Sequence, residues 1–174
     1  MSVRFSTFPR TKPPPGFVAD VVDVFKRNGN RIDTDHLQSG LTSDQVLAVL
    51  REDLIDIGFE VEESKRSTDR IRRPVFFGEN AEPSLQYEVD GWHSDWRAGL
   101  EVEAGRAWGG NAVYRDLVRA LVIVEMEHLI LAVPKIYRRK PRASKDYENT
   151  VAVAQALYGH SRITMPFSLC VIGY

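Results

Sequence analysis

The sequence lacks the residues and patterns that mark several large classes of protein. Its single cysteine, Cys170, excludes an internal disulfide and cannot supply the two thiols of a common zinc site. No apolar run approaches the ~18 residues that a membrane span needs, and no signal peptide opens the chain. The net charge of −1 provides no overall attraction to nucleic acid or to an anionic membrane. A cytoplasmic protein is therefore expected, and any contact with DNA must come from local basic segments.

What is present fits one globular domain. The chain has 174 residues, of which 43% are hydrophobic and 27% charged, which is ordinary for a soluble domain with a real core. Pro13, Pro14, Pro15 and Gly16 end an N-terminal stretch that is expected to be extended and without regular structure. The sequence therefore predicts a lead-in over residues 1–16 and a domain over residues 17–174.

Several helices are indicated by apolar residues at helical spacing. The first begins at Phe17 and ends before Asn28, and residues 30–41 are expected to form a loop. The second begins at Thr42, which with Gln45 forms a capping box, and ends at Gly58. A third helix is expected after Asn111, and a fourth over residues 146–158.

The strands complete the prediction of fold class. They are expected at residues 59–63, 85–92, 100–103, 129–133 and 167–172. The run Leu129–Val133 is continuously apolar and ends at Pro134, which is typical of a central buried strand. A helix between strands 100–103 and 129–133 favours a crossover between parallel neighbours. We therefore expect an α/β domain whose central mixed sheet is flanked by helices.

Four acidic residues are predicted to crowd one face of a β-hairpin. Glu88 and Asp90 share a face of the first strand, and Glu101 and Glu103 share a face of the second. With the turn centred near Asp95 and Trp96, the numbers of paired residues sum to about 191, which sets Asp90 opposite Glu101 and Glu88 opposite Glu103. Directly opposed residues on antiparallel strands have their Cβ atoms only ~5 Å apart.

Carboxylates at that spacing repel one another, so the hairpin needs compensation. A hard divalent cation such as Mg²⁺ would supply it, because Mg²⁺ takes carboxylate oxygens and keeps waters that a phosphate can replace. The alternative is an exposed hairpin face on which the acids are simply solvated, since acids that alternate with Val and Leu are common on half-buried strands.

The order of motifs resembles the PD-(D/E)xK nuclease superfamily. The resemblance rests on Glu88-Val89-Asp90, on Glu101-Val102-Glu103 after ten intervening residues, and on the helix and apolar strand that follow, including 114–117 and 129–134. It covers residues 42–174. Within the superfamily, Glu-Val-Glu is similar to the BamHI and BglII branch, in which Glu replaces the usual Lys. Val89 stands where the family name has Pro.

The resemblance implies a role for each residue of the hairpin. Asp90 and Glu101 would bind Mg²⁺, for which Mn²⁺ would substitute, and Glu103 would position or deprotonate the attacking water. The family often adds an acid from its first core helix, and Asp53 lies nearer the buried face of helix 42–58 than Glu52 does. The implied activity is hydrolysis of DNA phosphodiester bonds by an endonuclease, in the manner of a restriction endonuclease.

Two basic segments are candidates for contact with DNA, at residues 65–73 and 135–145. Solvated surface loops are the alternative for both.

The resemblance also implies that a homodimer is plausible. Two further functions stay open, namely a nuclease-fold DNA-binding or assembly module without catalysis and a structural domain whose acidic face binds a basic partner.

Overall fold

A computed structural model describes residues 3–33, 40–64, 66, 68–104, 109–139 and 142–174, without the side chains of residues 138, 139 and 142. The helices are α1 (Phe17–Arg27), α2 (Gly29–Ile32), α3 (Ser43–Asp56), α4 (Ala112–Val122) and α5 (Asp146–Gly159), with a 3-10 turn over Glu79–Ala81. The strands are β1 (Arg4–Phe8), β2 (Glu60–Val61), β3 (Ile71–Phe77), β4 (Pro83–Val89), β5 (Gly91–His93), β6 (Ala98–Val102), β7 (His128–Val133), β8 (Tyr137–Arg139), β9 (Arg142–Ser144) and β10 (Ser168–Gly173).

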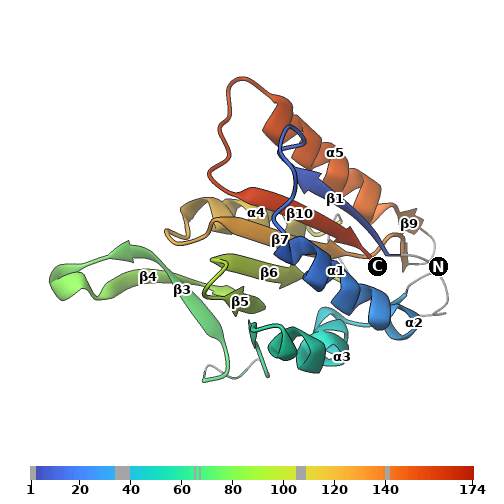
Figure 1. The fold of residues 1–174 in the computed structure, drawn as a ribbon, viewed down its shortest axis with the longest axis horizontal. Helices are drawn as coiled ribbons and strands as arrows, with labels where there is room; N and C mark the ends of the chain where they lie inside the picture. The colour runs from blue at the N-terminus through green and yellow to red at the C-terminus, as the bar shows by residue number, and fades with distance from the viewer. Residues whose placement is uncertain (1–2, 34–39, 65, 67, 105–108, 140–141) are drawn as a thin grey trace.

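A six-stranded mixed sheet forms the centre of the described chain, in the order β1-β10-β7-β6-β5-β2 (Figure 1). Strands β10, β7 and β6 run parallel to one another, while β1, β5 and β2 each run antiparallel to their neighbour. The predicted α/β class and mixed sheet are confirmed. The parallel pairing of β6 with β7 also agrees with the crossover expected from the intervening helix.

Helices cover both faces of this sheet, because β7 and β10 alternate between two apolar cores. Ile130 and Ala132 pack with α1 and α3, whereas Leu129, Leu131 and Val133 pack with α4 and α5. In Figure 1, α1 and α3 lie in front of the sheet and α4 lies behind it. Strand β7 has parallel neighbours on both sides and is buried from Leu129 onward, as expected for a central strand.

Local signals explain how two of these helices begin and end. Thr42 accepts a hydrogen bond from the Gln45 N–H at 3.3 Å, and the Gln45 side chain accepts from the Thr42 N–H at 2.9 Å, which confirms the capping box. Gly58 follows α3 with a φ of +99°, a conformation that suits glycine. Asn111 precedes α4 with a φ of +57°, but its side chain makes no capping hydrogen bond, so the predicted cap is wrong.

The N-terminal prediction is wrong for residues 4–8. These residues form β1, an edge strand that pairs with β10 from Arg4–Gly173 to Phe8–Leu169. Their sequence, Arg-Phe-Ser-Thr-Phe, does not alternate strictly and a proline run follows it, so the local pattern did not indicate a strand and only the pairing with β10 defines one. Residues 29–32 likewise form α2 within the segment expected to be a loop, and residues 34–39 lie outside the described residues.

The predicted strand 85–92 is divided into two strands in different sheets. β4 pairs with β3 to form a two-stranded ribbon, here called the arm, which projects from the body of the molecule (Figure 1). β5 remains in the main sheet beside β6. The division falls at Asp90, between the two strands. In the described part of the chain, no helix has the length and apolar character needed to cross a bilayer.

Candidate active site

An acidic pocket lies at the C-terminal end of β6. Its cavity of about 790 Å³ is walled by the first turns of α3, the chain after β2, the base of the arm, the end of β6 and one side of α4. Asp90, Glu101 and Glu103 all line it. The structure therefore brings the three predicted site residues into one cavity.

The predicted hairpin register is confirmed within β5 and β6. Gly91 pairs with Leu100 and His93 with Ala98, so paired numbers sum to 191. Asp90 lies one residue beyond this ladder, and its Oδ2 accepts a hydrogen bond from the Val102 N–H at 2.8 Å. The expected pairing of Glu88 with Glu103 is wrong, because β4 leaves the hairpin to pair with β3, where Glu88 lies opposite Arg72.

The carboxyl groups of Asp90 and Glu101 are held in surroundings that disfavour their charge. Glu101 is only 6% exposed, which excludes a simply solvated side chain at this position. Burial and the nearby Asp90 raise the pKa of Glu101 well above its ordinary value. Burial also raises the pKa of Asp90 to about 7, although the hydrogen bond from Val102 opposes that rise. Both acids therefore lack sufficient positive charge from the protein itself.

Glu103 is fixed by its backbone and by a cation from α4. Its N–H donates to the Ala132 carbonyl at 2.9 Å, and its carbonyl accepts from the Tyr174 hydroxyl at 3.0 Å. Arg115 donates from Nη2 to Glu103 Oε1 at 2.5 Å. Burial and the charge of Asp116 nevertheless raise the pKa of Glu103 to about 7.

Asp116 is a fourth acid of this cluster that the sequence reasoning missed. It is 1% exposed on α4, and its Oδ1 accepts from Arg115 Nε at 2.9 Å. Its Oδ2 is buried and accepts from no described donor, but the Asp116 carboxyl lies within hydrogen-bonding reach of the Glu103 carboxyl, a contact that needs a proton on one of the two acids. The signal was available, since Asp116 lies between Val113 and Ala120 on the apolar stripe of the helix, where a carboxylate is costly to bury without a partner.

The donor set suits a hard divalent cation by its chemistry. Seven acidic residues and four arginines line the pocket, so the acids outnumber the cations. No group of three or more His, Cys, Asp or Glu side chains that could hold a metal ion occurs among the residues described. The carboxylate oxygens and their excess negative charge fit Mg²⁺, because this ion prefers oxygen ligands. The described side chains are not already arranged as a complete set of ligands around one point.

The acid that helix α3 contributes is Asp44, and Asp53 lies elsewhere. Asp53 accepts from Asn28 Nδ2 at 2.6 Å and pairs with Arg27 at 3.3 Å, which satisfies its charge against α1. Asp44 lines the pocket and contributes to the raised pKa of Asp90. The hydrogen bond of 3.0 Å from the Ala104 N–H to Ser43 Oγ brings this first turn of α3 to the end of β6.

The basic segment 65–73 is largely ion-paired where it is described. Arg70 and Arg72 both pair with Glu88, and Arg73 pairs with Glu125. Arg73 also lies over the ring of buried Trp92, with its Cζ 4.2 Å from the ring centroid. Lys65 lies outside the described residues. These arginines therefore tie the arm to itself and to the body.

The second basic segment, 135–145, begins with a buried cation. Lys135 is 8% exposed, and its Nζ donates to Asp33 Oδ2 at 3.3 Å, which removes it from the surface. The side chains of Arg138, Arg139 and Arg142, together with Lys140, lie outside the described residues. β8 and β9 pair as a short hairpin, and Lys145 is exposed just after it.

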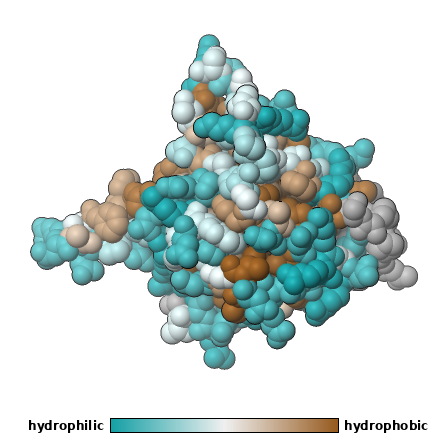
Figure 2. Space-filling model, in the orientation of Figure 1, coloured by the Kyte–Doolittle hydropathy of each residue, from teal (hydrophilic) through white to brown (hydrophobic). Residues whose placement is uncertain are grey.

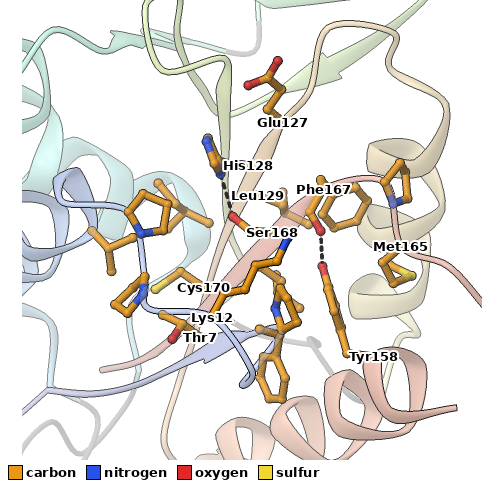
Figure 3. A pocket seen from close by; sticks show the side chains of 18 of the residues that line it. Thr7, Lys12, Glu127, His128, Leu129, Tyr158, Met165, Phe167, Ser168 and Cys170 are labelled. Atoms are coloured by element: carbon orange, nitrogen blue, oxygen red, sulfur yellow. Dashed lines mark hydrogen bonds between the residues drawn. The ribbon is translucent and has the colours of Figure 1, made fainter.

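A second cavity, of about 660 Å³, lies at the opposite end of the parallel strands (Figure 3). There His128 Nδ1 and Ser168 Oγ lie 2.6 Å apart, at the first residues of β7 and β10, and the Tyr158 hydroxyl donates to the Phe167 carbonyl at 2.6 Å. Cys170 is buried beside it, and burial raises the pKa of its thiol to about 12, which confirms it as a core residue. This cavity lacks the clustered carboxylates of the acidic pocket.

Comparison with known proteins identifies the family to which the chain belongs. A family model described as "Putative halobacteria restriction endonuclease" matches residues 20–174, which is nearly the whole chain. No curated protein and no solved structure matches this chain. The matched region contains every residue of the acidic pocket. The chain therefore belongs to this restriction endonuclease family.

Proposed function

We propose that this chain is a divalent-metal-dependent endonuclease that hydrolyses phosphodiester bonds of DNA in the acidic pocket. The observation that carries the proposal is the group of Asp90, Glu101 and Glu103, which line one cavity with raised pKa values and too few cations. Such acids are costly to a fold and are expected where a function needs them. The finer resemblance to the BamHI and BglII branch is part of the proposal.

Asp90 and Glu101 are the proposed ligands of Mg²⁺, with Mn²⁺ as its substitute. Asp90 has one oxygen fixed by the Val102 N–H, and Glu101 lies on the adjacent strand, so each can present an oxygen to the same cation. The bound metal would polarise the phosphate and lower the pKa of a coordinated water. Asp116 Oδ2 and Asp44 are further oxygens at the edge of the cluster.

Glu103 is the proposed group that positions the attacking water or takes its proton. Arg115 holds Glu103 Oε1, and the Glu103 carboxyl also lies within hydrogen-bonding reach of Asp116, so the two acids can share a proton that Glu103 takes from the water. Asp116 in turn holds Arg115, so the guanidinium keeps a fixed position between the two acids. Arg119 lines the same cavity and is suited to hold a phosphate oxygen.

The test is cleavage of supercoiled plasmid DNA with and without Mg²⁺. The wild-type protein is expected to nick or linearise DNA only when Mg²⁺ or Mn²⁺ is present, and Asp90→Asn is expected to abolish cleavage. Glu52→Gln provides the matched control, because Glu52 is an exposed acid of α3 outside the pocket. Equal nicking by wild type and Asp90→Asn would refute the site.

A second candidate function is a DNA-binding or assembly module that keeps the fold without catalysis. The Glu103–Arg115 ion pair favours it, since this cation already satisfies one oxygen of the proposed base. The two candidates differ in metal binding, because an ion bound only by the folded state raises the melting temperature. No cleavage together with no stabilisation by Mg²⁺ or Mn²⁺ would select the module.

The proposed DNA surface includes the exposed members of the two basic segments. Arg66 and Lys145 are exposed, whereas Arg70, Arg72 and Arg73 form ion pairs and Lys135 is buried. Contacts to backbone phosphates release counterions, so affinity is expected to fall steeply with salt. Affinity that is independent of salt would exclude these segments as the contact surface.

A further inference from the structure

The second cavity lies at the N-terminal ends of β7 and β10, at the opposite end of the parallel strands from the acidic pocket (Figure 3). Three stretches of chain that are far apart in sequence wall it, within residues 7–18, 127–130 and 158–170. Its volume of about 660 Å³ falls in the range of about 300–1,000 Å³ that is typical of small-molecule sites. The proposed nuclease chemistry uses none of these residues, so the cavity needs an explanation of its own.

Most of the cavity wall is apolar, and part of it is rigid. The rings of Phe8 and Tyr158 have their centroids 5.6 Å apart, and Phe167 lines the same space. Pro13–Pro15 form one side, where each proline ring fixes its own φ. The Val18 N–H donates to the carbonyl of the last of these prolines at 3.1 Å, which joins this side to the first turn of α1. The cavity can therefore receive an apolar ligand with little ordering of its walls.

The wall carries one positive charge that no described acid balances. It includes two residues with charged side chains, Lys12 and Glu127. Glu127 Oε1 accepts from Arg97 Nη1 at 2.5 Å, so an arginine outside the wall already neutralises this acid. Lys12 is exposed and forms no ion pair within the described residues, and Figure 3 shows its side chain extended toward the start of β10. Burial lowers the pKa of His128, so this side chain adds no second positive charge at neutral pH. The wall therefore favours an anionic ligand.

Ser168 can add a hydrogen bond to the charge of Lys12. Its Oγ lies 2.6 Å from His128 Nδ1, and the two residues are paired at the start of parallel strands. When Nδ1 carries the imidazole proton, His128 donates to Ser168, whose own hydroxyl proton is then available to an anionic oxygen. The Tyr158 hydroxyl is already committed, since it donates to the Phe167 carbonyl at 2.6 Å. Lys12 and Ser168 are therefore the donors assigned to an anionic head group.

We propose that the second cavity binds a small organic anion with an apolar body, a ligand distinct from DNA and from the metal of the acidic pocket. The anionic head contacts Lys12 and Ser168, and the body packs against the aromatic wall of Phe8, Tyr158 and Phe167. Because the walls come from both ends of the chain, a bound ligand joins the segment before α1 to the start of β10 and stabilises the fold. This site does not depend on the proposed nuclease activity, so either proposal can fail alone.

The test is a fluorescence titration with anilinonaphthalene sulfonate, an apolar anion, and with N-phenylnaphthylamine, which has the same rings without the sulfonate. We expect one saturable site for the sulfonate. Lys12→Met removes the charge and keeps an unbranched side chain, and it should weaken sulfonate binding by about tenfold, the lower end of what a hydrogen bond to a charged group contributes. The uncharged analogue should bind both proteins equally. Lys145→Met is the matched control, since Lys145 is exposed outside the cavity, and it should change neither affinity.

The probe has to be assigned to the cavity, because the arm also carries hydrophobic surface (Figure 2). Phe77 is 53% exposed there, and Phe77→Ser should leave the affinity for the sulfonate unchanged. Ile163 is 43% exposed and lines the cavity, so Ile163→Glu sets a negative charge in its wall and should weaken sulfonate binding by about tenfold or more. Ile55→Glu is the matched control, since Ile55 is a 50% exposed apolar residue on α3 outside the cavity.

A second readout locates the probe without a change of charge. Ile163→Cys introduces an exposed thiol in the cavity wall, while Cys170 is buried and should not react. Anilinonaphthalene sulfonate should slow the reaction of Ile163→Cys with a maleimide and leave that of Ile55→Cys unchanged. A wild type without a saturable site for the sulfonate would overturn the proposal. So would sulfonate binding that Lys12→Met and Lys145→Met affect equally, with melting curves showing both variants folded.

Discussion

Glu88 and Asp90 are two residues apart, yet they occupy opposite electrostatic surroundings. Glu88 lies on the arm, where Arg70 pairs with it and Arg72 Nε lies 3.6 Å from its Oε1. Asp90 lies in the main body, where its carboxylate receives a backbone N–H and makes no ion pair with a described cation. The arm thus balances the charge of Glu88 internally, whereas no described cation pairs with Asp90. Under the proposed function, this contrast separates a structural acid, Glu88, from a metal-binding one, Asp90.

The largest expected effect is on catalysis, and it should divide the two kinds of acid. Glu101→Gln removes a proposed metal ligand, so the rate of DNA cleavage should fall about a thousandfold or more. Glu88→Gln removes an acid of similar size whose charge is already balanced, and its rate should stay within about a factor of ten. Single-turnover cleavage at saturating protein measures both. If both variants lost cleavage rate to a similar extent, Glu88 and Glu101 would not differ in function.

The next largest effect is on the free energy of unfolding measured without divalent ions. Glu101→Gln should raise it and Glu88→Gln should lower it. Glu101→Gln relieves a buried acid that lies close to Asp90, Asp116 and Glu103, so it should stabilise the fold by about 1–2 kcal/mol. That gain corresponds to a melting temperature higher by roughly 2–8 °C. Glu88→Gln breaks a partly exposed ion pair and should lower stability by less than about 1 kcal/mol.

Thermal denaturation in a chelator, followed by circular dichroism, measures both changes. Adding Mg²⁺ should then stabilise the wild type much more than Glu101→Gln, because the variant lacks a ligand. A destabilised Glu101→Gln that still gains stability from Mg²⁺ would contradict the assignment of Glu101.

Much of the fold could be predicted because local signals decided it. The capping box at Thr42, the proline after Val133 and the helical spacing from Phe17 each fix an element by short-range chemistry. The arm could not be predicted in this way, because it depends on which strand pairs with residues 83–89. β3 contains Pro74 and two arginines, so its sequence resembled a basic loop more than a strand.

The candidate site shows a similar division. The hairpin register placed Asp90 beside Glu101, as local geometry requires. Asp116 and Asp44 approach the pocket through the packing of α4 and α3 against the end of β6, a tertiary arrangement that spacing along the chain does not reveal. A carboxylate on the buried stripe of a helix indicates that the acid has a specific partner. This holds for Asp53, which pairs with Asn28 and Arg27, and for Asp116, which pairs with Arg115.

A smaller effect tests how the arm is joined to the body. Arg73 has a 22% exposed side chain that pairs with Glu125 and covers Trp92, whereas the Arg72 side chain is 44% exposed. Arg73→Met should therefore destabilise the protein by about 1–2 kcal/mol, and Arg72→Met by less than about 0.5 kcal/mol. Urea unfolding monitored by tryptophan fluorescence measures both. Equal losses would mean that Arg73 does not anchor the arm.

The smallest expected effect concerns DNA binding, and it extends the contrast between balanced and unbalanced charges. Arg66 is exposed, so Arg66→Gln should lower the slope of log affinity against log salt by about 0.9 if it contacts one phosphate. Arg70 is held by Glu88 and would have to break that ion pair to contact DNA, so Arg70→Gln should change the slope much less. Fluorescence anisotropy with a labelled duplex over a range of KCl concentrations measures both slopes. A larger change for Arg70 than for Arg66 would show that the arm exchanges its internal ion pair for phosphate, and that the balanced charge of the arm belongs to the DNA surface after all.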